Sequence, residues 1–328
     1  MKPLFLVSFP IVLFSLLPPP ATVDVEIQEW DVPWESSRPR DPYVGPDYRV
    51  WFVGQRGDYV AYLEPRSGEF KRYDLEEGAG PHNLIVADNG DVWYAGNRAA
   101  HIGKLDPKTG EIKKIPMPNP DARDPHTLTF DGRGHIWFTV QGGNFVGRLD
   151  TATANVELIR VPTERARPYG IVIDESGRPW IAEFGSYKIA TVDPKTMKLK
   201  EIELPDQSSR PRRIALTSDG MVWYVDYAEG RLGRLDPASG EVAEWPTPGG
   251  GESRPYAMAA DDQDRLWFVE TGLSPNRLVG FDPATEEFVA TTDIPSGGGT
   301  VRNMVFYQPK REIWFGTDVN TVGRASIP

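Results

Sequence analysis

The sequence predicts an all-β fold in which seven four-stranded blades close into a ring, on the strength of three features. Seven tryptophans recur at intervals of 42 to 47 residues, at Trp51, Trp93, Trp137, Trp180, Trp223, Trp267 and Trp314. Each follows an apolar residue, and most precede Phe or Tyr. The chain also contains 31 Pro and 32 Gly, as many tight turns require. A period in the forties built from short strands is typical of a β-propeller.

The repeat from Gly80 to Pro118 shows how one blade is built. Four short segments alternate with turn residues, at His82 to Ala87, Val92 to Ala95, His101 to Leu105 and Glu111 to Pro116. Asn89 and Gly90 tolerate positive φ, so they favour a tight turn between the first two segments. The last segment alternates polar and apolar residues, as an outer strand does. Each repeat therefore predicts a four-stranded meander.

A hairpin loop of the type Asp-Pro-Lys-Thr-Gly joins the third and fourth strands. It recurs at 64–68, 106–110, 193–197, 236–240 and 282–286, with a diverged copy at 150–153. Proline presets φ early in the loop, and glycine takes the left-handed conformation at its end. Met197 and Glu286 replace that glycine, which predicts a different loop in those two blades.

The seventh repeat ends before its outer strand. The missing segment has a counterpart at the other end of the chain, because residues 25–33 resemble the outer strand at 240–248. The N-terminal strand is therefore predicted to complete the last blade, and residues 24–328 to form a single domain.

Composition limits the classes of function. The formal net charge of −11 argues against nucleic acid as a partner. The chain has no cysteine, so thiolate metal sites and cysteine nucleophiles are excluded. Residues 1–21 combine Lys2 with an apolar run from Leu4 to Leu17, as in a secretory signal peptide, with an uncleaved anchor as the alternative. We expect an exported, monomeric protein, periplasmic or secreted, with no further transmembrane segment.

Two positions in each repeat are predicted to face the mouth of the central channel. The first lies eleven residues before the repeat tryptophan and usually follows a proline. Around the ring it holds Arg40, His82, His126, Tyr169, Arg212 and Tyr256, and after a one-residue insertion Arg302. These side chains suit an anion, a carbonyl-rich ligand or an ester, although each could also simply fill the channel. His101 and His135 lie off this ring.

The second position lies three residues after the tryptophan. It holds carboxylates in three adjacent blades, at Glu183, Asp226 and Glu270. Carboxylates brought close together repel one another unless a cation or an arginine compensates them. They therefore predict either a site for a hard metal cation or salt bridges to Arg212 and other arginines.

The repeat pattern resembles the virginiamycin B lyase (streptogramin lyase) family. It runs Pro-[His/Tyr/Arg], then an Asp/Gly turn, Trp-[Phe/Tyr], and [Ile/Leu/Val]-Gly-[Lys/Arg]-Leu-Asp-Pro-x-[Thr/Ser]-Gly-Glu, with the best copies at 82–116, 167–205 and 210–248. The resemblance implies a seven-bladed propeller that opens cyclic depsipeptides by elimination, using magnesium and a histidine pair in two consecutive late blades. Here those two positions hold Tyr256 and Arg302.

The only consecutive histidine pair on the ring is His82 and His126, with Asp124 two residues before the latter. The resemblance then implies an exported lyase with His126 as base, Asp124 orienting it and His82 assisting. Tyr169 and Arg40 would bind carbonyl oxygens, with Arg212, Tyr256 and Arg302 as further substrate-binding residues. The alternative is a non-catalytic propeller that holds a small anionic or polymeric ligand at the same mouth.

Overall fold

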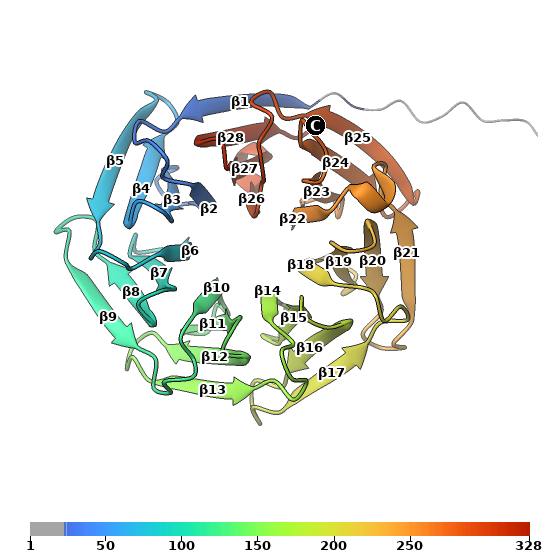
Figure 1. Cartoon of the computed structure of the whole chain (residues 1–328), viewed down its shortest axis with the longest axis horizontal. Helices are drawn as coiled ribbons and strands as arrows, with labels where there is room; N and C mark the ends of the chain where they lie inside the picture. Colours follow the sequence, from blue (N-terminus) through green and yellow to red (C-terminus); the bar gives the residue numbers. More distant parts are fainter. Residues whose placement is uncertain (1–22, 24) are drawn as a thin grey trace, which may run out of the picture.

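The computed structural model describes residue 23 and residues 25–328, so the leader predicted over residues 1–21 lies outside the described residues. Seven separate four-stranded sheets surround a central axis (Figure 1), in the described part of the chain. The predicted seven-bladed ring is confirmed. No helix within the described residues has the length and apolar character needed to cross a membrane.

The innermost strand of each blade starts at the same mouth of the channel. These strands are β2 (Pro39–Val44), β6 (Pro81–Val86), β10 (Pro125–Phe130), β14 (Pro168–Ile173), β18 (Pro211–Leu216), β22 (Pro255–Ala260) and β26 (Met304–Tyr307). The second strands carry the repeat tryptophans and are β3 (Val50–Gly54), β7 (Val92–Gly96), β11 (His135–Val140), β15 (Pro179–Glu183), β19 (Val222–Asp226), β23 (Leu266–Glu270) and β27 (Glu312–Gly316).

The third and outer strands follow with antiparallel pairing throughout. The third strands are β4 (Tyr59–Glu64), β8 (His101–Leu105), β12 (Phe145–Asp150), β16 (Lys188–Val192), β20 (Arg231–Leu235), β24 (Arg277–Asp282) and β28 (Thr321–Ser326). The outer strands are β5 (Glu69–Asp74), β9 (Ile112–Pro116), β13 (Val156–Arg160), β17 (Leu199–Glu203), β21 (Val242–Pro246), β25 (Glu287–Asp293) and β1 (Glu26–Asp31). Short 3₁₀ turns occur at η1 (Gly250–Glu252) and η2 (Gln308–Lys310).

The N-terminal strand closes the ring, as predicted. Strand β1 pairs with β28 in register from Glu26 opposite Ser326 to Asp31 opposite Thr321, and the two lie side by side in Figure 1. Trp30 stacks on Trp314 with ring centroids 5.4 Å apart. The last blade is therefore held together by strands from both ends of the chain.

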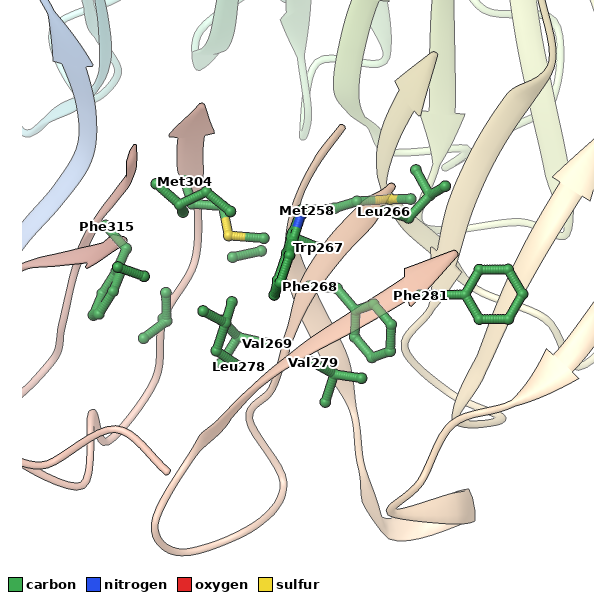
Figure 2. Packing of buried hydrophobic residues seen from close by; sticks show 14 of the residues in the cluster. Met258, Leu266, Trp267, Phe268, Val269, Leu278, Val279, Phe281, Met304 and Phe315 are labelled. Atoms are coloured by element: carbon green, nitrogen blue, oxygen red, sulfur yellow. The ribbon is translucent and has the colours of Figure 1, made fainter. Parts of the chain in front are cut away.

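The core lies between blades, and the repeat tryptophans are part of it. All seven are at least 95% buried. Figure 2 shows one such layer, in which Trp267 and Val269 of β23 lie near Met304 and Phe315 of the next blade. Apolar burial contributes about 25 cal/mol per Å² of surface removed from water. Packing between blades, rather than within a single sheet, therefore stabilises the ring.

The hairpin loops keep a left-handed residue at their last position even where glycine is missing. The fifth loop residue donates its N–H to the carbonyl of the first, at 2.8 Å for both Gly110 and Met197. Met197 and Glu286 both adopt φ of +57°, in the left-handed region. The prediction of a different loop was therefore wrong at Met197, where the hairpin hydrogen bond holds the conformation despite the side chain. At Glu286 the left-handed φ is the same, but the β24–β25 hairpin has a register shift between Gly280 and Phe281.

A bulge near the start of the inner strand shapes the channel mouth. In six blades the pairing between inner and second strands shifts register within the first three or four residues of the inner strand. Bulges re-aim side chains and recur beside functional sites. As a result, two consecutive residues in each of several blades reach the channel, instead of one.

Candidate functional site

The seven predicted ring residues begin the inner strands at one mouth of the channel. Six lie at the second residue of their strand, and Arg302 lies just before β26. Arg40, His82, His126, Tyr169 and Tyr256 are each at least 94% buried, whereas Arg212 and Arg302 are only half-buried. The sequence register therefore located this ring of polar side chains correctly.

His82 and His126 lie in direct contact. Their ring centroids are 3.6 Å apart, and the His126 Nδ1 atom lies 2.9 Å from Thr127 Oγ1 in a hydrogen bond. Burial, together with the positive charges of Arg40 and Arg213, lowers the pKa of His82 well below its ordinary value. Burial and the neighbouring His82 do the same to the pKa of His126. Both imidazoles are therefore neutral at physiological pH.

Two tyrosines continue the ring. The Tyr169 ring centroid is 4.1 Å from that of His126, and its hydroxyl hydrogen-bonds the hydroxyl of Tyr256. Burial opposes ionisation of Tyr169, but Arg212, Arg40 and Arg213 outweigh it and lower its pKa below the ordinary value for tyrosine. Burial and the partner phenol raise the pKa of Tyr256. The pair therefore differs in acidity although the two residue types are the same.

Arg212 stands among aromatic rings instead of beside a carboxylate. Its guanidinium carbon lies 3.6 Å from the ring centroid of Tyr256 and 5.1 Å from that of Tyr169. The ring centroids of Phe184 and Tyr227 lie 4.4 and 4.3 Å from the same guanidinium carbon. Stacking of this kind stabilises a cation and leaves its charge available to a ligand.

A second layer of polar residues crosses the channel beneath the ring. The Arg213 guanidinium reaches from β18 to three other blades, bonding Asp41 Oδ2 at 3.3 Å, Thr127 Oγ1 at 3.2 Å and the Arg302 carbonyl at 3.1 Å. Asp41 also accepts from Arg40 Nε at 2.9 Å and from Asn83 at 3.1 Å. Through Thr127, this buried network is linked to His126.

A cavity of about 260 Å³ lies along the channel beyond this layer. Asn83, Thr127 and Arg213 belong to its lining, and most of the other lining residues are apolar residues of the inner strands. Its lining includes none of the seven ring residues. The second layer of polar residues thus separates the mouth from the remainder of the channel.

Asp124 does not contact His126 as the orienting role would require. Its carboxylate accepts backbone N–H groups from Gly142 at 2.5 Å and Gly143 at 2.9 Å. It therefore secures the loop between β11 and β12. The hydrogen-bond partner of His126 Nδ1 is Thr127, supported in turn by Arg213.

The three carboxylates of the predicted metal site are wholly buried, but each is engaged in its own blade. Glu183 accepts from Ser186 at 2.8 Å, and Asp226 from three backbone amides including that of Arg210 at 2.9 Å. Glu270 pairs with Arg277 at 2.6 Å. Burial raises the pKa of Glu183 to about 7.

These contacts fit local salt bridges and loop anchoring better than a shared magnesium ion, although the arginine partner is Arg277 and not Arg212. Within residues 25–328, no group of three or more His, Asp or Glu side chains is arranged to hold a metal. The two remaining histidines lie off the ring, as expected. His101 is buried beside Tyr94, and His135 lies 2.9 Å from Asp131.

The described geometry defines a propeller with a buried, arginine-rich polar cluster at one mouth of its channel. The Virginiamycin B lyase family model matches residues 25–325. The chain belongs to this family. A comparison with curated proteins finds no match.

Solved structures agree on the fold. Virginiamycin B lyase from Staphylococcus aureus is 24% identical with a TM-score of 0.83, over 93% of this chain and 100% of that one. A streptogramin B lyase is 26% identical with a TM-score of 0.82, over 93% of this chain and 98% of that one. A catalytically inactive histidine-to-alanine form of the Staphylococcus aureus lyase, solved with quinupristin, is 24% identical with a TM-score of 0.84, over the same shares as the first.

The same search also finds more distant propellers. Hydrazine synthase from Kuenenia stuttgartiensis is 14% identical with a TM-score of 0.73, covering 90% of this chain and 97% of that one. Likeness at this level concerns the fold alone.

Proposed function

We propose that the protein is a carbon–oxygen lyase that opens a cyclic ester by elimination at the channel mouth. The observation that carries this proposal is the contact between His82 and His126, two buried imidazoles whose lowered pKa values keep them neutral. A neutral imidazole can accept a proton, which a buried imidazolium could not. His126 Nε2 is the candidate base, because Nδ1 is already held by Thr127.

The reaction is balanced without water or a redox partner. His126 Nε2 takes the proton from the carbon beside an activating carbonyl. The freed electron pair forms a carbon–carbon double bond to the adjacent carbon. The bond from that adjacent carbon to the ester oxygen then breaks, and its electrons leave with the carboxylate. Arg40 and Tyr169 flank the histidine pair and are suited to stabilise the enolate oxygen that develops.

Quinupristin provides the first test, because a relative has been solved with it. The purified protein is incubated with quinupristin, beside His126→Ala and the matched variant His135→Ala, whose imidazole lies off the ring. Opening by the wild type and by His135→Ala, with loss of at least two orders of magnitude in His126→Ala, is the expected result. Equal turnover in all three proteins would exclude His126 as base.

Magnesium forms a separate arm of this experiment, since the family resemblance implies it. No step above is assigned to a metal, because Glu183, Asp226 and Glu270 each bond within their own blade. We expect turnover both with magnesium and with a chelator. Loss of activity in the chelator would point to a ligand set other than these three carboxylates.

A second candidate function is a non-catalytic ligand-binding propeller. The observation that favours it is Arg212, whose charge is surrounded by aromatic rings and has no carboxylate partner within residues 25–328. A thermal-shift screen with Arg212→Ala and Tyr256→Ala as controls tests this candidate. Ligands whose effect survives both substitutions would place binding elsewhere.

We also propose that the chain is exported, on the basis of Lys2 and the apolar run from Leu4 to Leu17, and that the exported protein is a monomer. N-terminal sequencing of protein recovered from outside the cytoplasm would test cleavage near residue 21. Light scattering of the purified protein would test the oligomeric state.

A further inference from the structure

The channel mouth contains buried nitrogen atoms that have no hydrogen-bond partner among the described residues. They are Arg40 Nη2, His82 Nδ1, His126 Nε2, Arg212 Nε and Arg302 Nη1. Buried polar atoms in native structures are nearly always partnered, so each exception calls for an explanation. All five belong to the ring, and therefore to one end of the channel.

Charge at the mouth is also unbalanced. Within the described residues, four guanidinium groups at the mouth form ion pairs with two carboxylates, and a fifth, that of Arg212, forms none. Asp41 forms ion pairs with Arg40 and Arg213, and Asp318 forms ion pairs with Arg302 and Arg38. Arg212 lies among four aromatic rings. This concentration of positive charge stands out in a chain whose formal net charge is −11.

The arginines of the mouth lie close enough to the ring histidine and tyrosine side chains to change their pKa values. Arg40 and Arg302, from the first and last blades, both lower the pKa of His82. Arg212, from the next blade, and Arg40, from the opposite side of the ring, both lower the pKa of Tyr169. Arg40 is thus close both to the histidine pair, together with Arg302, and to Tyr169, together with Arg212.

We propose that Arg40, Arg212 and Arg302 form a carboxylate-binding subsite at the channel mouth. Guanidinium groups present planar N–H donors that match the two oxygens of a carboxylate. The subsite rests on the proposed function in one respect only, namely the origin of its ligand. Elimination from a cyclic ester leaves a carboxylate on the opened chain, and this is the group the subsite holds as the carbon–oxygen bond breaks.

Binding of acetate tests the subsite without any turnover. Isothermal titration of the purified protein with sodium acetate is compared with inorganic phosphate at constant ionic strength. Arg212→Gln is the test variant, because removing Arg212 leaves no buried carboxylate unpaired. Arg66→Gln is its control, because it removes the same charge from an exposed hairpin loop. A charge-assisted hydrogen bond corresponds to about a tenfold change in affinity.

Saturable acetate binding that weakens about tenfold in Arg212→Gln and is unchanged in Arg66→Gln is the expected result. Phosphate binding as tight as acetate would overturn the assignment to carboxylate. Acetate binding equal in both variants, or absent from the wild type, would overturn the subsite. Quinupristin opening is measured on the same proteins. Turnover without acetate binding refutes the subsite alone, and acetate binding without turnover refutes the lyase alone.

Discussion

Replacing Glu183 by glutamine should remove a pH dependence from the stability of the fold. The carboxyl group of Glu183 is wholly buried at the end of β15, where Ser186 donates to one oxygen and the other has no partner within the described chain. Burial raises its pKa from 4.5 to about 7. A shift of that size corresponds to about 3 kcal/mol of differential stability, at about 1.4 kcal/mol per pKa unit.

The direction of this pH dependence follows from proton binding to Glu183 in the folded and unfolded states. Between pH 4.5 and about 7, the unfolded chain has released the proton of Glu183 while the folded chain still holds it. Folding is therefore favoured at low pH, and this contribution is lost as the pH rises through the folded pKa. The neutral amide introduced by Glu183→Gln has no such proton to lose.

Urea unfolding at about pH 5 and about pH 8 measures the effect. Relative to wild type, Glu183→Gln should gain about 2 to 3 kcal/mol of stability between the two pH values. Glu175→Gln, at an exposed turn, is the control that should show no such gain. A variant whose stability follows wild type at both pH values would refute burial of an unpaired carboxyl oxygen here.

Three other outcomes follow from the structure. Trp30→Ala should destabilise the protein by about 1 to 3 kcal/mol, because its indole stacks on Trp314 where the N-terminal strand closes the ring; unchanged urea unfolding would contradict that closure. Ultraviolet titration should show one tyrosinate forming at a lower pH than an ordinary tyrosine requires, because Arg212, Arg40 and Arg213 stabilise the Tyr169 phenolate. That transition should vanish in Tyr169→Phe and persist in Tyr43→Phe, so its survival in the first variant would refute the assignment. Asp124→Ala should cost about 1 to 3 kcal/mol by freeing the Gly142 and Gly143 amides, while the His126 imidazole signals in NMR keep their pH dependence; a shift in that dependence would restore an orienting role.

The sequence predicts the ring of polar residues well because the repeat tryptophan acts as a fixed reference. Strand lengths and turns vary little between blades, so counting eleven residues back from Trp93 or Trp137 reaches His82 or His126. The closure by β1 was likewise predictable, since its sequence matches an outer strand of another blade.

The second layer of the site was missed because strand alternation hides it. Asp41 and Arg213 directly follow ring residues, and a regular strand would turn their side chains to the opposite face. The bulge at the start of the inner strand brings both into the channel. The sequence did contain one signal for this layer. A charged residue directly follows a ring arginine in Arg40-Asp41 and Arg212-Arg213.

The local partners of the carboxylates could not be predicted from the sequence for a different reason. Sequence register places Glu270 and Asp124 near the mouth, but it does not show which loop amides or arginines reach them. Arg277 lies directly across the hairpin from Glu270, and the Gly142-Gly143 loop folds over Asp124. Local partners therefore engage these groups before a distant cation or imidazole can.

The central claim is that the neutral histidine pair opens an ester by elimination, and the mass of the product tests it most directly. Quinupristin incubated with wild-type protein should yield an opened product of unchanged mass, and no product with His126→Ala. A product heavier by one water would show hydrolysis, and an unaltered cyclic substrate would show no opening. Either result would contradict the account.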